Sequence, residues 1–462
     1  MTTWLDSVAG IVGPRHLITD PDTLAAACLD WRGRYRGRAQ AIARPGSTAE
    51  VAALVRACVA AGAPIVPQGG NTSHCGAATP DDSGRALIIQ LHRMQALRAV
   101  DADNNTLTAE AGCTLAQVQD AAAGVGRLFP LSLASEGSCQ IGGNLATNAG
   151  GVAVLRYGPM RELTLGLEAV LPDGSVLDSL SGLRKNNTGY DLKQLLIGAE
   201  GTLGIITAAT LKLFPAPEAT ATALVEVSNP ADALALLHAL QARFGDRLTA
   251  FELISGLCLQ LLARHLPDAR PPFMPPWCVL LELNDGGDEA VLNQALAEAL
   301  CALRPQADAV LARHARERAQ LWTLREQISE AQKRDGPSIK HDIAVPLSQL
   351  ARFIERADAA LQQAFPGCRV VCFGHVGDGN LHYNVSFTRP DNVDLFDDEP
   401  AVNTLVYDLV YAHGGTLSAE HGIGQLKRDW LRRYLPPANL AAMRAVKQAL
   451  DPLGLMNPGK VL

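Results

Sequence analysis

The most informative segment is PQGGNTSHCG at residues 67–76, which follows the short apolar strand predicted at 64–66. Its paired glycines, Gly69 and Gly70, let backbone N–H groups converge on an anion, so a dinucleotide or a phosphate is its natural ligand. Neither Gly-x-x-x-x-Gly-Lys-Ser/Thr nor Gly-x-Gly-x-x-Gly occurs in the chain. The sequence therefore disfavours a P-loop and a nicotinamide-binding Rossmann unit.

Two further glycine-rich segments follow before residue 207. The second is GSCQIGGNLATNAGG at 137–151, a predicted loop whose small residues and amides would let a bulky flat ligand lie against the backbone. The third is GAEGTLGII at 198–206, which turns into a strand. One such segment would be an ordinary tight turn, but three together favour a binding site.

The composition is that of a globular chain of two or three structural units. At about 150 residues per domain, 462 residues allow that number, and 48% of them are hydrophobic and 19% charged. A net charge of −7 and the lack of like-charge runs argue against a nucleic-acid partner. The most apolar stretch, 51–61, is short and contains Arg56, so no membrane span is predicted.

The N-terminus and the cysteines indicate a reducing compartment. Residues 1–6, MTTWLD, lack the basic patch and apolar core of a targeting peptide, so we expect a cytoplasmic protein. The 10 cysteines are scattered without a Cys-x-x-Cys, which predicts reduced, buried thiols.

Two helices and a hairpin are predicted in the first half of the chain. The Ser-x-x-Glu spacing at 47–50 and the Thr-x-x-Gln spacing at 114–117 are capping boxes, and the helices that they open should end near Gly62 and Gly124. Alternating residues around a Pro-Asp-Gly turn predict a hairpin over 165–178. A domain boundary is expected at the two prolines of 214–217, with Glu218 opening a Leu/Ala-rich helical stretch.

Histidines and a carboxylate form the first chemical cluster. In GHVGDGNLHYN at 374–384, a two-residue turn at 378–379 would place His375 and His382 directly opposite each other. SAEHGIG at 418–424 adds Glu420 and His421. His, His and Glu with open positions are typical of a catalytic zinc or a similar divalent ion, whereas either segment alone would more simply hold hydrogen-bonded histidines.

A second cluster carries positive charge. Residues 324–330, LREQISE, predict one helix with Arg325 and Ser329 on the same face, and Lys340 follows on a strand predicted at 338–342. Taken alone, Arg325 would be a surface ion-pair residue.

Residues 67–80 fit the pattern Pro-x-Gly-Gly-x-Thr-x3-Gly-x3-Pro, and with the other two loops they resemble the FAD-binding domain of the vanillyl-alcohol-oxidase-type flavoproteins. The resemblance covers nearly the whole chain. Residues 129–131 (FPL), LRKNNTGYDLK at 183–193 and Asn457-Pro458 are most similar to the D-2-hydroxyglutarate and D-lactate dehydrogenase branch.

The resemblance implies an α+β fold in three parts. A two-subdomain FAD-binding domain would comprise residues 1–216, and a substrate- and metal-binding domain with an antiparallel sheet flanked by helices would comprise 217–415. A C-terminal helical segment, 416–462, would complete the active site and return to the FAD domain.

The resemblance also implies non-covalent FAD. Family members that link flavin covalently use a histidine in the first loop, whereas Asn71 follows Gly70 here and His74 lies three residues further on. The residues expected to bind FAD lie on the three loops and near the C-terminus: Pro67, Gln68, Gly69, Gly70, Asn71, Thr72, Gly76, Gly137, Ser138, Gly142, Gly143, Asn144, Thr147, Asn148, Gly150, Gly151, Gly201, Gly204, Ile206 and Asn457.

For the second domain the resemblance implies a divalent metal, which we expect to be zinc, although manganese or cobalt would also suit the ligands. Its ligands would be His375, His382 and Glu420, and His421 would be the base. An imidazole titrates in the right range to take the hydroxyl proton while hydride leaves the same carbon for flavin. Neighbours on a strand point to opposite faces, so Glu420 and His421 require a loop.

Substrate binding is implied for Arg325, Ser329, Lys340 and Asn384, and Ser329 stands where the hydroxyglutarate branch has a threonine. Arginine and lysine together suit two carboxylates better than one, and Asn384 favours a dicarboxylate over lactate.

The expected activity is thus the oxidation of D-2-hydroxyglutarate to 2-oxoglutarate, with D-lactate or D-malate as the nearest alternative substrates. The electron acceptor would be electron-transfer flavoprotein or a quinone-linked route, and a homodimer is left open. From other classes, a metal hydrolase with structural glycine loops and a flavin carrier without turnover are the alternatives.

Overall fold

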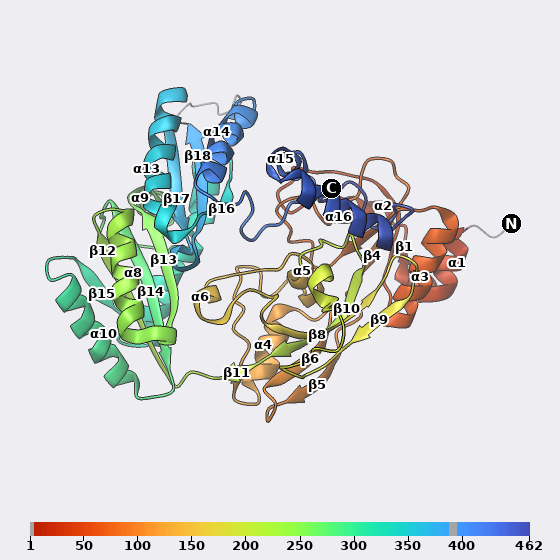
Figure 1. Cartoon of the computed structure of the whole chain (residues 1–462), viewed down its shortest axis with the longest axis horizontal. Coiled ribbons are helices and arrows are strands. Elements are labelled where there is room, and N and C mark those ends of the chain that lie inside the picture. The colour runs from red at the N-terminus through yellow and green to blue at the C-terminus, as the bar shows by residue number, and fades with distance from the viewer. Residues whose placement is uncertain (1–3, 388–394) are drawn as a thin grey trace. The chain divides into compact units, whose positions relative to one another are not determined.

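The computed structural model describes residues 4–387 and 395–462, which form two compact units (Figure 1). The first unit comprises Met1–Gly150, Gly158–Ala216 and Glu420–Leu462, and the second comprises Gly151–Tyr157 and Pro217–Ala419. Residues 1–3, on which the expectation about the N-terminus partly rests, lie outside the described residues. The predicted α+β class is confirmed, because helices accompany separate, largely antiparallel sheets in both units.

The first unit begins with a four-stranded sheet in the order β1-β2-β4-β3. Strand β1 is antiparallel to β2, and the other pairs are parallel. The strands are β1 (Leu17–Ile18), β2 (Ala39–Ala43), β3 (Ile65–Gln68) and β4 (Ala86–Gln90). The accompanying helices are α1 (Trp4–Val12), η1 (Pro14–His16), α2 (Pro21–Ala27) and α3 (Thr48–Ala61).

Helix α3 begins and ends where the sequence predicts. The Ser47 hydroxyl accepts a hydrogen bond from the Glu50 N–H, and Gly62 ends the helix with φ 62°. The Glu50 carboxylate, however, accepts from the Gly46 N–H, so only one half of the predicted capping box forms. In α4 (Leu115–Ala123) both halves form between Thr114 and Gln117.

An antiparallel five-stranded sheet follows in the order β5-β6-β10-β8-β9, and it includes the predicted hairpin as β8 and β9. Its strands are β5 (Leu97–Asp101), β6 (Thr106–Glu110), β8 (Thr164–Val170), β9 (Val176–Ser179) and β10 (Ile205–Lys212). Smaller elements of the unit are β7 (Arg127–Leu128) paired with β11 (Phe214–Pro215), α5 (Ile141–Ala146) and α7 (Lys193–Leu196).

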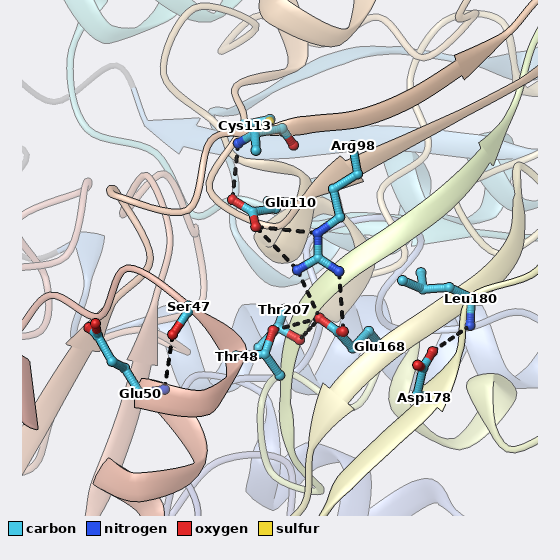
Figure 2. A network of polar contacts seen from close by, with 11 residues as sticks. Ser47, Thr48, Glu50, Arg98, Glu110, Cys113, Glu168, Asp178, Leu180 and Thr207 are labelled. Atoms are coloured by element: carbon cyan, nitrogen blue, oxygen red, sulfur yellow. Dashed lines mark hydrogen bonds and ion pairs between the residues drawn. The ribbon is translucent and has the colours of Figure 1, made fainter.

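A polar network connects helix α3 to this five-stranded sheet (Figure 2). Glu168 on β8 accepts hydrogen bonds from both terminal nitrogens of Arg98, at 3.1 and 3.2 Å, and from Thr48 and Thr207. Burial opposes ionisation, but these bonds lower the pKa of Glu168. Because Thr48 is the first residue of α3 and Arg98 lies on β5, Glu168 fixes the helix start to the sheet.

The C-terminal segment belongs to the first unit and contains α15 (Arg428–Tyr434) and α16 (Pro437–Leu450). Lys447 donates hydrogen bonds to the carbonyls of Thr202 and Met456. Met456 forms a parallel bridge with Ile65 of β3, so the end of the chain adds to the first sheet.

The second unit is built on one antiparallel sheet in the order β15-β12-β14-β13-β17-β18-β16. Its strands are β12 (Ala219–Val227), β13 (Leu248–Ser255), β14 (Trp277–Asp285), β15 (Ala309–Leu311), β16 (Asp342–Ala344), β17 (Cys368–Gly374) and β18 (Asn380–Phe387). Its helices are α6 (Val154–Tyr157), α8 (Pro230–Phe244), η2 (Gly245–Arg247), α9 (Gly256–His265), α10 (Glu289–Leu303), α11 (Ala315–Glu326), α12 (Ile328–Asp335), α13 (Leu347–Ala364), η3 (Val376–Asp378) and α14 (Glu399–Ala412).

Helices cover this sheet and close its core. Helices α8 and α13 lie side by side against the strands (Figure 1). Ile254, Leu280 and Phe373 from three neighbouring strands share an apolar cluster with residues of α9, α11 and α12. None of the helices in the described residues is long and apolar enough to cross a membrane.

Two predictions about composition and boundaries can be compared with the structure. The helical stretch expected from Glu218 begins with a strand instead, because ATATALVEV at 219–227 forms β12 between two other strands, where a largely apolar run is buried on both faces. The helices of this stretch, α8 and α10, follow further along the chain. Of the ten cysteines, all free thiols, nine are buried as predicted and Cys301 is exposed.

Candidate functional site

The three glycine-rich segments converge within the first unit. A Cβ atom on Gly70 would lie 2.0 Å from the Ser138 carbonyl oxygen, so the first loop passes directly over the second. A Cβ on Gly201 would lie 3.1 Å from Pro67, so the third loop contacts the start of the first. Gly70 is therefore required where the two backbones meet, whereas Gly201 packs against the Pro67 ring with a left-handed φ of 70° that favours glycine.

The second segment is predicted to be a loop, but its residues Ile141–Ala146 form helix α5. Gly142 makes this helix fit, since a Cβ there would lie 2.8 Å from the Ala111 side chain. A Cβ on Gly143 would meet nothing within 4 Å. Gly142 thus packs against Ala111, whereas at Gly143 the helix has neither a side chain nor a close neighbour.

The expected FAD-binding residues take the following positions. Pro67 and Gln68 end strand β3 and are followed by the first loop, which contains Gly69, Gly70, Asn71, Thr72 and Gly76. Gly137 and Ser138 precede α5, Gly142, Gly143 and Asn144 lie in it, and Thr147, Asn148 and Gly150 follow it. Gly151 is counted with the second unit, Gly201 and Gly204 precede β10, Ile206 lies in β10, and Asn457 lies near the C-terminus.

Some of these side chains are occupied in shaping the loops. The Gln68 amide donates to the carbonyls of Ala27 and Ala78 and accepts from Gln90. The Asn71 amide donates to the Leu29 carbonyl at 2.9 Å, and its φ of 53° is left-handed. Gln68 and Asn71 therefore hold the first loop in shape.

Buried polar atoms without partners fit a large polar ligand on these segments. Among the described residues, Ser73 Oγ, Thr79 Oγ1, Gln140 Oε1 and Asn457 Oδ1 are buried without a hydrogen-bond partner. Such atoms are rare in folded proteins and commonly indicate a ligand or water. These four lie on the first loop, the second segment and the C-terminal segment, so the site fits a dinucleotide such as FAD.

The loop that carries His421 is held by a carboxylate that the sequence did not single out. Glu200, within the third glycine-rich segment, accepts hydrogen bonds from the N–H groups of Ile423, at 2.6 Å, and Gly424, at 2.8 Å. A Cβ on Gly424 would lie 2.1 Å from the Cys75 carbonyl oxygen, so this loop also touches the first loop. Burial raises the pKa of Glu200 to about 7, against the effect of the two N–H donors.

The ring of His421 stacks on His74 of the first loop. The two ring centroids are 4.5 Å apart with an interplanar angle of 16°, and Trp31 lies 5.0 Å beyond His74. Residues 419–424 form neither helix nor strand, as the adjacency of Glu420 and His421 requires. The candidate base is therefore positioned by the same unit that carries the glycine loops.

In the second unit, His375 and His382 converge, but through a different turn from the one predicted. His382 pairs with Phe373, and His375 lies beyond strand β17, where it caps the 3-10 turn η3. The two-residue turn is wrong because Gly379, with φ 88°, returns the chain after η3, where a Cβ would lie 2.4 Å from the Val345 carbonyl oxygen. The ring centroids are 6.0 Å apart, and the ligand nitrogens are within 4.8 Å.

A buried carboxylate connects this histidine pair to Arg325. Glu252 on β13 contacts His375 Nδ1 at 2.5 Å and accepts from Arg325 Nε at 2.6 Å. Although burial opposes ionisation, these two groups lower the pKa of Glu252 to about 2. Arg325 is buried, with its guanidinium 4.8 Å from the centre of the Phe373 ring, so the surface ion-pair interpretation is wrong.

Two other expected substrate residues, Ser329 and Lys340, differ from the prediction in their secondary structure. The predicted single helix over 324–330 is wrong, because α11 ends at Glu326 and α12 begins at Ile328, so Arg325 and Ser329 belong to different helices. Lys340 lies before β16 and not on a strand, because only Ile339 bridges to β18 ahead of Asp342.

Asn384 lies on β18 and has a partner that the sequence did not reveal. Its amide donates to Gln332 Oε1 at 2.9 Å. Gln332 is buried on α12, and its Nε2 has no hydrogen-bond partner in the described part of the chain. An amide donor thus stands unsatisfied beside a residue expected to contact substrate.

The donor set of the second unit fits a divalent metal. Burial lowers the pKa of His382 to about 3, so this imidazole is neutral, the form that ligates metal. A carboxylate oxygen of Asp342 lies within 4.8 Å of a His382 nitrogen. The Ala419 N–H donates to the Asp342 carbonyl at 3.3 Å, and Glu420 is the next residue of the chain.

Comparison with known proteins defines the class to which this fold and site belong. Residues 39–179 match the family described as FAD binding domain, and residues 216–461 match FAD linked oxidases, C-terminal domain. The chain therefore belongs to the FAD-linked oxidase family and is an FAD-dependent oxidoreductase.

Its curated relatives include D-2-hydroxyglutarate dehydrogenases along nearly the whole chain. The mitochondrial enzyme of Bos taurus is 39% identical over 460 residues, covering 98% of this chain and 82% of that protein. The enzyme of Xanthomonas citri is 38% identical over 453 residues, covering 96% of this chain and 94% of that protein. The enzyme of Stutzerimonas stutzeri is 37% identical, covering 99% of this chain and 98% of that protein.

Solved structures show the same fold at low identity. Substrate-bound p-cresol methylhydroxylase superposes with a TM-score of 0.79 at 18% identity, covering 99% of this chain and 96% of that one. Alkyldihydroxyacetonephosphate synthase superposes with a TM-score of 0.72 at 19% identity, covering 98% of this chain and 84% of that one. Together with the two family matches, this shared fold confirms the resemblance to vanillyl-alcohol-oxidase-type flavoproteins.

Proposed function

We propose that the protein oxidises D-2-hydroxyglutarate to 2-oxoglutarate with non-covalent FAD and a divalent metal, zinc in our proposal. The observation that carries this proposal is the burial of Arg325 on the same carboxylate that holds His375. An arginine beside a metal-binding histidine pair suits a substrate with one carboxylate near the reacting carbon and a second at a distance. The names of the relatives support this choice of substrate.

The metal ligands in this proposal are His375, His382 and Glu420. These residues would hold a divalent ion, which would make the hydroxyl group of a 2-hydroxy acid easier to deprotonate and help to orient the substrate. Support comes from the nearby ring nitrogens of the two histidines and the neutral state of His382.

We assign the base to His421, which takes the hydroxyl proton at a ring nitrogen. Stacking on His74 limits rotation of its ring, and Glu200 fixes the loop behind it. Orientation of this kind lowers the entropy cost of reaching the transition state.

Substrate carboxylates are held in this proposal by Arg325 and Lys340, and Asn384 and Ser329 contact the substrate chain. Arg325 presents a guanidinium whose orientation is set by Glu252 and the Phe373 ring. A planar guanidinium binds a carboxylate through two parallel hydrogen bonds, and together with the Lys340 cation it suits two carboxylates better than the single carboxylate of D-lactate.

FAD is held by the expected residues of the three glycine-rich segments and Asn457. When bound, it accepts the hydride from the substrate carbon. Asn71 in place of a linking histidine supports a non-covalent complex. Electron-transfer flavoprotein as acceptor, a homodimer and a cytoplasmic location stay predictions. Membership of the FAD-linked oxidases disfavours the metal hydrolase.

An anaerobic titration tests the proposal. The purified protein should show flavin absorption that D-2-hydroxyglutarate bleaches faster than D-lactate or D-malate does. Bleaching only by D-lactate or D-malate would keep the chemistry and replace the substrate. A protein whose flavin none of the three reduces would overturn the proposed function.

A further inference from the structure

Glu252 is a buried acidic residue on the central strand of the second unit's sheet. It lies on β13, between β14 and β17, and its side chain is 0% exposed. A carboxylate in such a place is costly to bury unless every lone pair is matched by a donor. Glu252 uses one oxygen for His375 and the other for Arg325, so the two donors are brought to opposite ends of one group.

The contact with His375 selects a tautomer. Glu252 accepts a hydrogen bond from Nδ1–H, so in the neutral imidazole Nε2 is the nitrogen that carries the lone pair. His375 lies outside the paired part of β17, so the ladder does not orient its ring. A carboxylate behind a ligating imidazole fixes the ring and raises its basicity.

The contact with Arg325 orients a guanidinium. Glu252 accepts from Nε at 2.6 Å, and the Phe373 ring lies 4.8 Å from the guanidinium carbon. One edge and one face of the guanidinium are thereby set, and the terminal nitrogens are not used by Glu252. Arg325 is the penultimate residue of α11, just before the interruption at Gln327, so the helix alone constrains it weakly.

We propose that Glu252 is a positioning residue that couples the two halves of the substrate site, orienting the metal ligand His375 and the carboxylate-binding Arg325 together. The inference rests on the proposed function, which assigns those two roles. Only a carboxylate can serve both donors, because an amide would turn an N–H₂ group toward one of them.

The test compares Glu252→Gln and Glu252→Asp with the control Glu282→Gln. Glu282 is a carboxylate on the adjacent strand β14 that accepts from Trp322 and Thr222. Binding of Zn²⁺ is measured by equilibrium dialysis without substrate, and kcat and KM for D-2-hydroxyglutarate are measured at saturating Zn²⁺.

Glu252→Gln should weaken Zn²⁺ binding about 10–100-fold, raise KM for D-2-hydroxyglutarate, and leave the flavin absorption unchanged. Glu252→Asp keeps the charge but is one methylene shorter, so it should reach only one of the two donors. It should therefore either weaken Zn²⁺ binding or raise KM, and leave the other quantity unchanged. Glu282→Gln should change neither.

The outcomes separate this inference from the proposed function. If the wild-type protein binds no Zn²⁺, the proposed metal site fails and the coupling falls with it. If the wild type binds Zn²⁺ and Glu252→Gln retains both the affinity and KM, only the coupling is overturned. Should Glu252→Gln fail to fold, an Asp variant with both quantities unchanged would overturn the coupling by itself.

Discussion

His421 is held in place by residues far away in the sequence. Its ring stacks on His74, and the backbone two and three residues beyond it donates to Glu200, which lies 223 residues before Ile423. Neither contact could be predicted from the SAEHGIG segment, because both depend on how the first and third glycine-rich segments fold against it. The role of His421 as base therefore stays a prediction that its surroundings support.

Replacing His421 by Asn should leave FAD bound and slow flavin reduction by D-2-hydroxyglutarate about 10²–10⁴-fold, because no side chain then takes the hydroxyl proton. Stopped-flow absorption under anaerobic conditions measures this rate. His238, exposed on α8, serves as the matched control for a His→Asn change. An unchanged reduction rate in the His421 variant would remove it as the base.

Glu200 should give the first unit a pH-dependent stability. Burial raises its pKa from 4.5 to about 7, so between these pH values the folded state binds more protons than the unfolded state. The free energy of unfolding should therefore fall as the pH rises through this window, by about 3 kcal/mol in total.

The Glu200→Gln variant should lack this fall, because its amide does not titrate. Thermal unfolding of both proteins from pH 4.5 to 8 provides the comparison, with the exposed Glu162→Gln as control. Parallel curves for wild type and Glu200→Gln would contradict the assignment.

Elements whose boundaries depend on local signals agree with the sequence. Helices α3 and α4 begin at their capping residues, and the β8–β9 hairpin forms around its Pro-Asp-Gly turn. Elements whose boundaries depend on neighbours do not. Strand β12 occupies the start of the stretch predicted to be helical from Glu218, and it is fixed there by pairing with β14 and β15. The helix predicted over 324–330 is interrupted at Gln327.

The connection of α3 to the five-stranded sheet predicts a stability effect. Glu168→Ala removes the acceptor of Arg98, Thr48 and Thr207, and leaves the two hydroxyls partly unsatisfied. We expect a loss of about 2 kcal/mol in the free energy of unfolding, measured by chemical denaturation. The surface pair of Glu317 with Arg313 offers a control, since Glu317→Ala should change stability little. Equal effects of the two variants would argue against a special role for Glu168.

The whole chain divides its chemistry between two compact units. The glycine-rich segments apart from Gly151, together with Asn457 and His421, belong to the first unit, whereas His375, His382 and Arg325 belong to the second. The first unit therefore carries all the expected flavin-binding residues except Gly151, and it carries the candidate base. The second carries two expected metal ligands and the expected carboxylate-binding arginine.

This division predicts that metal and flavin can be removed separately. Treatment with EDTA followed by desalting should leave the flavin absorption unchanged and abolish its bleaching by D-2-hydroxyglutarate, and added Zn²⁺ should restore bleaching. Metal content and visible spectra of the same samples check both statements. Full activity in a metal-free sample would contradict the metal site.

The glycine-rich loops, the helix starts, the pair of histidines and the family could all be recognised in the amino-acid sequence. These depend on backbone conformations and hydrogen bonds within a few residues, which residue types control directly. The register of the histidine hairpin and the contacts of Glu200 and Glu252 were revealed by the folded chain alone. Glu252 and His375 are 123 residues apart. Nothing in the neighbouring sequence distinguishes Glu200 or Glu252 from a glutamate at the surface. The contacts of these two glutamates follow from their burial, because a buried carboxylate is costly without hydrogen-bond donors, and the fold brings those donors from distant parts of the chain.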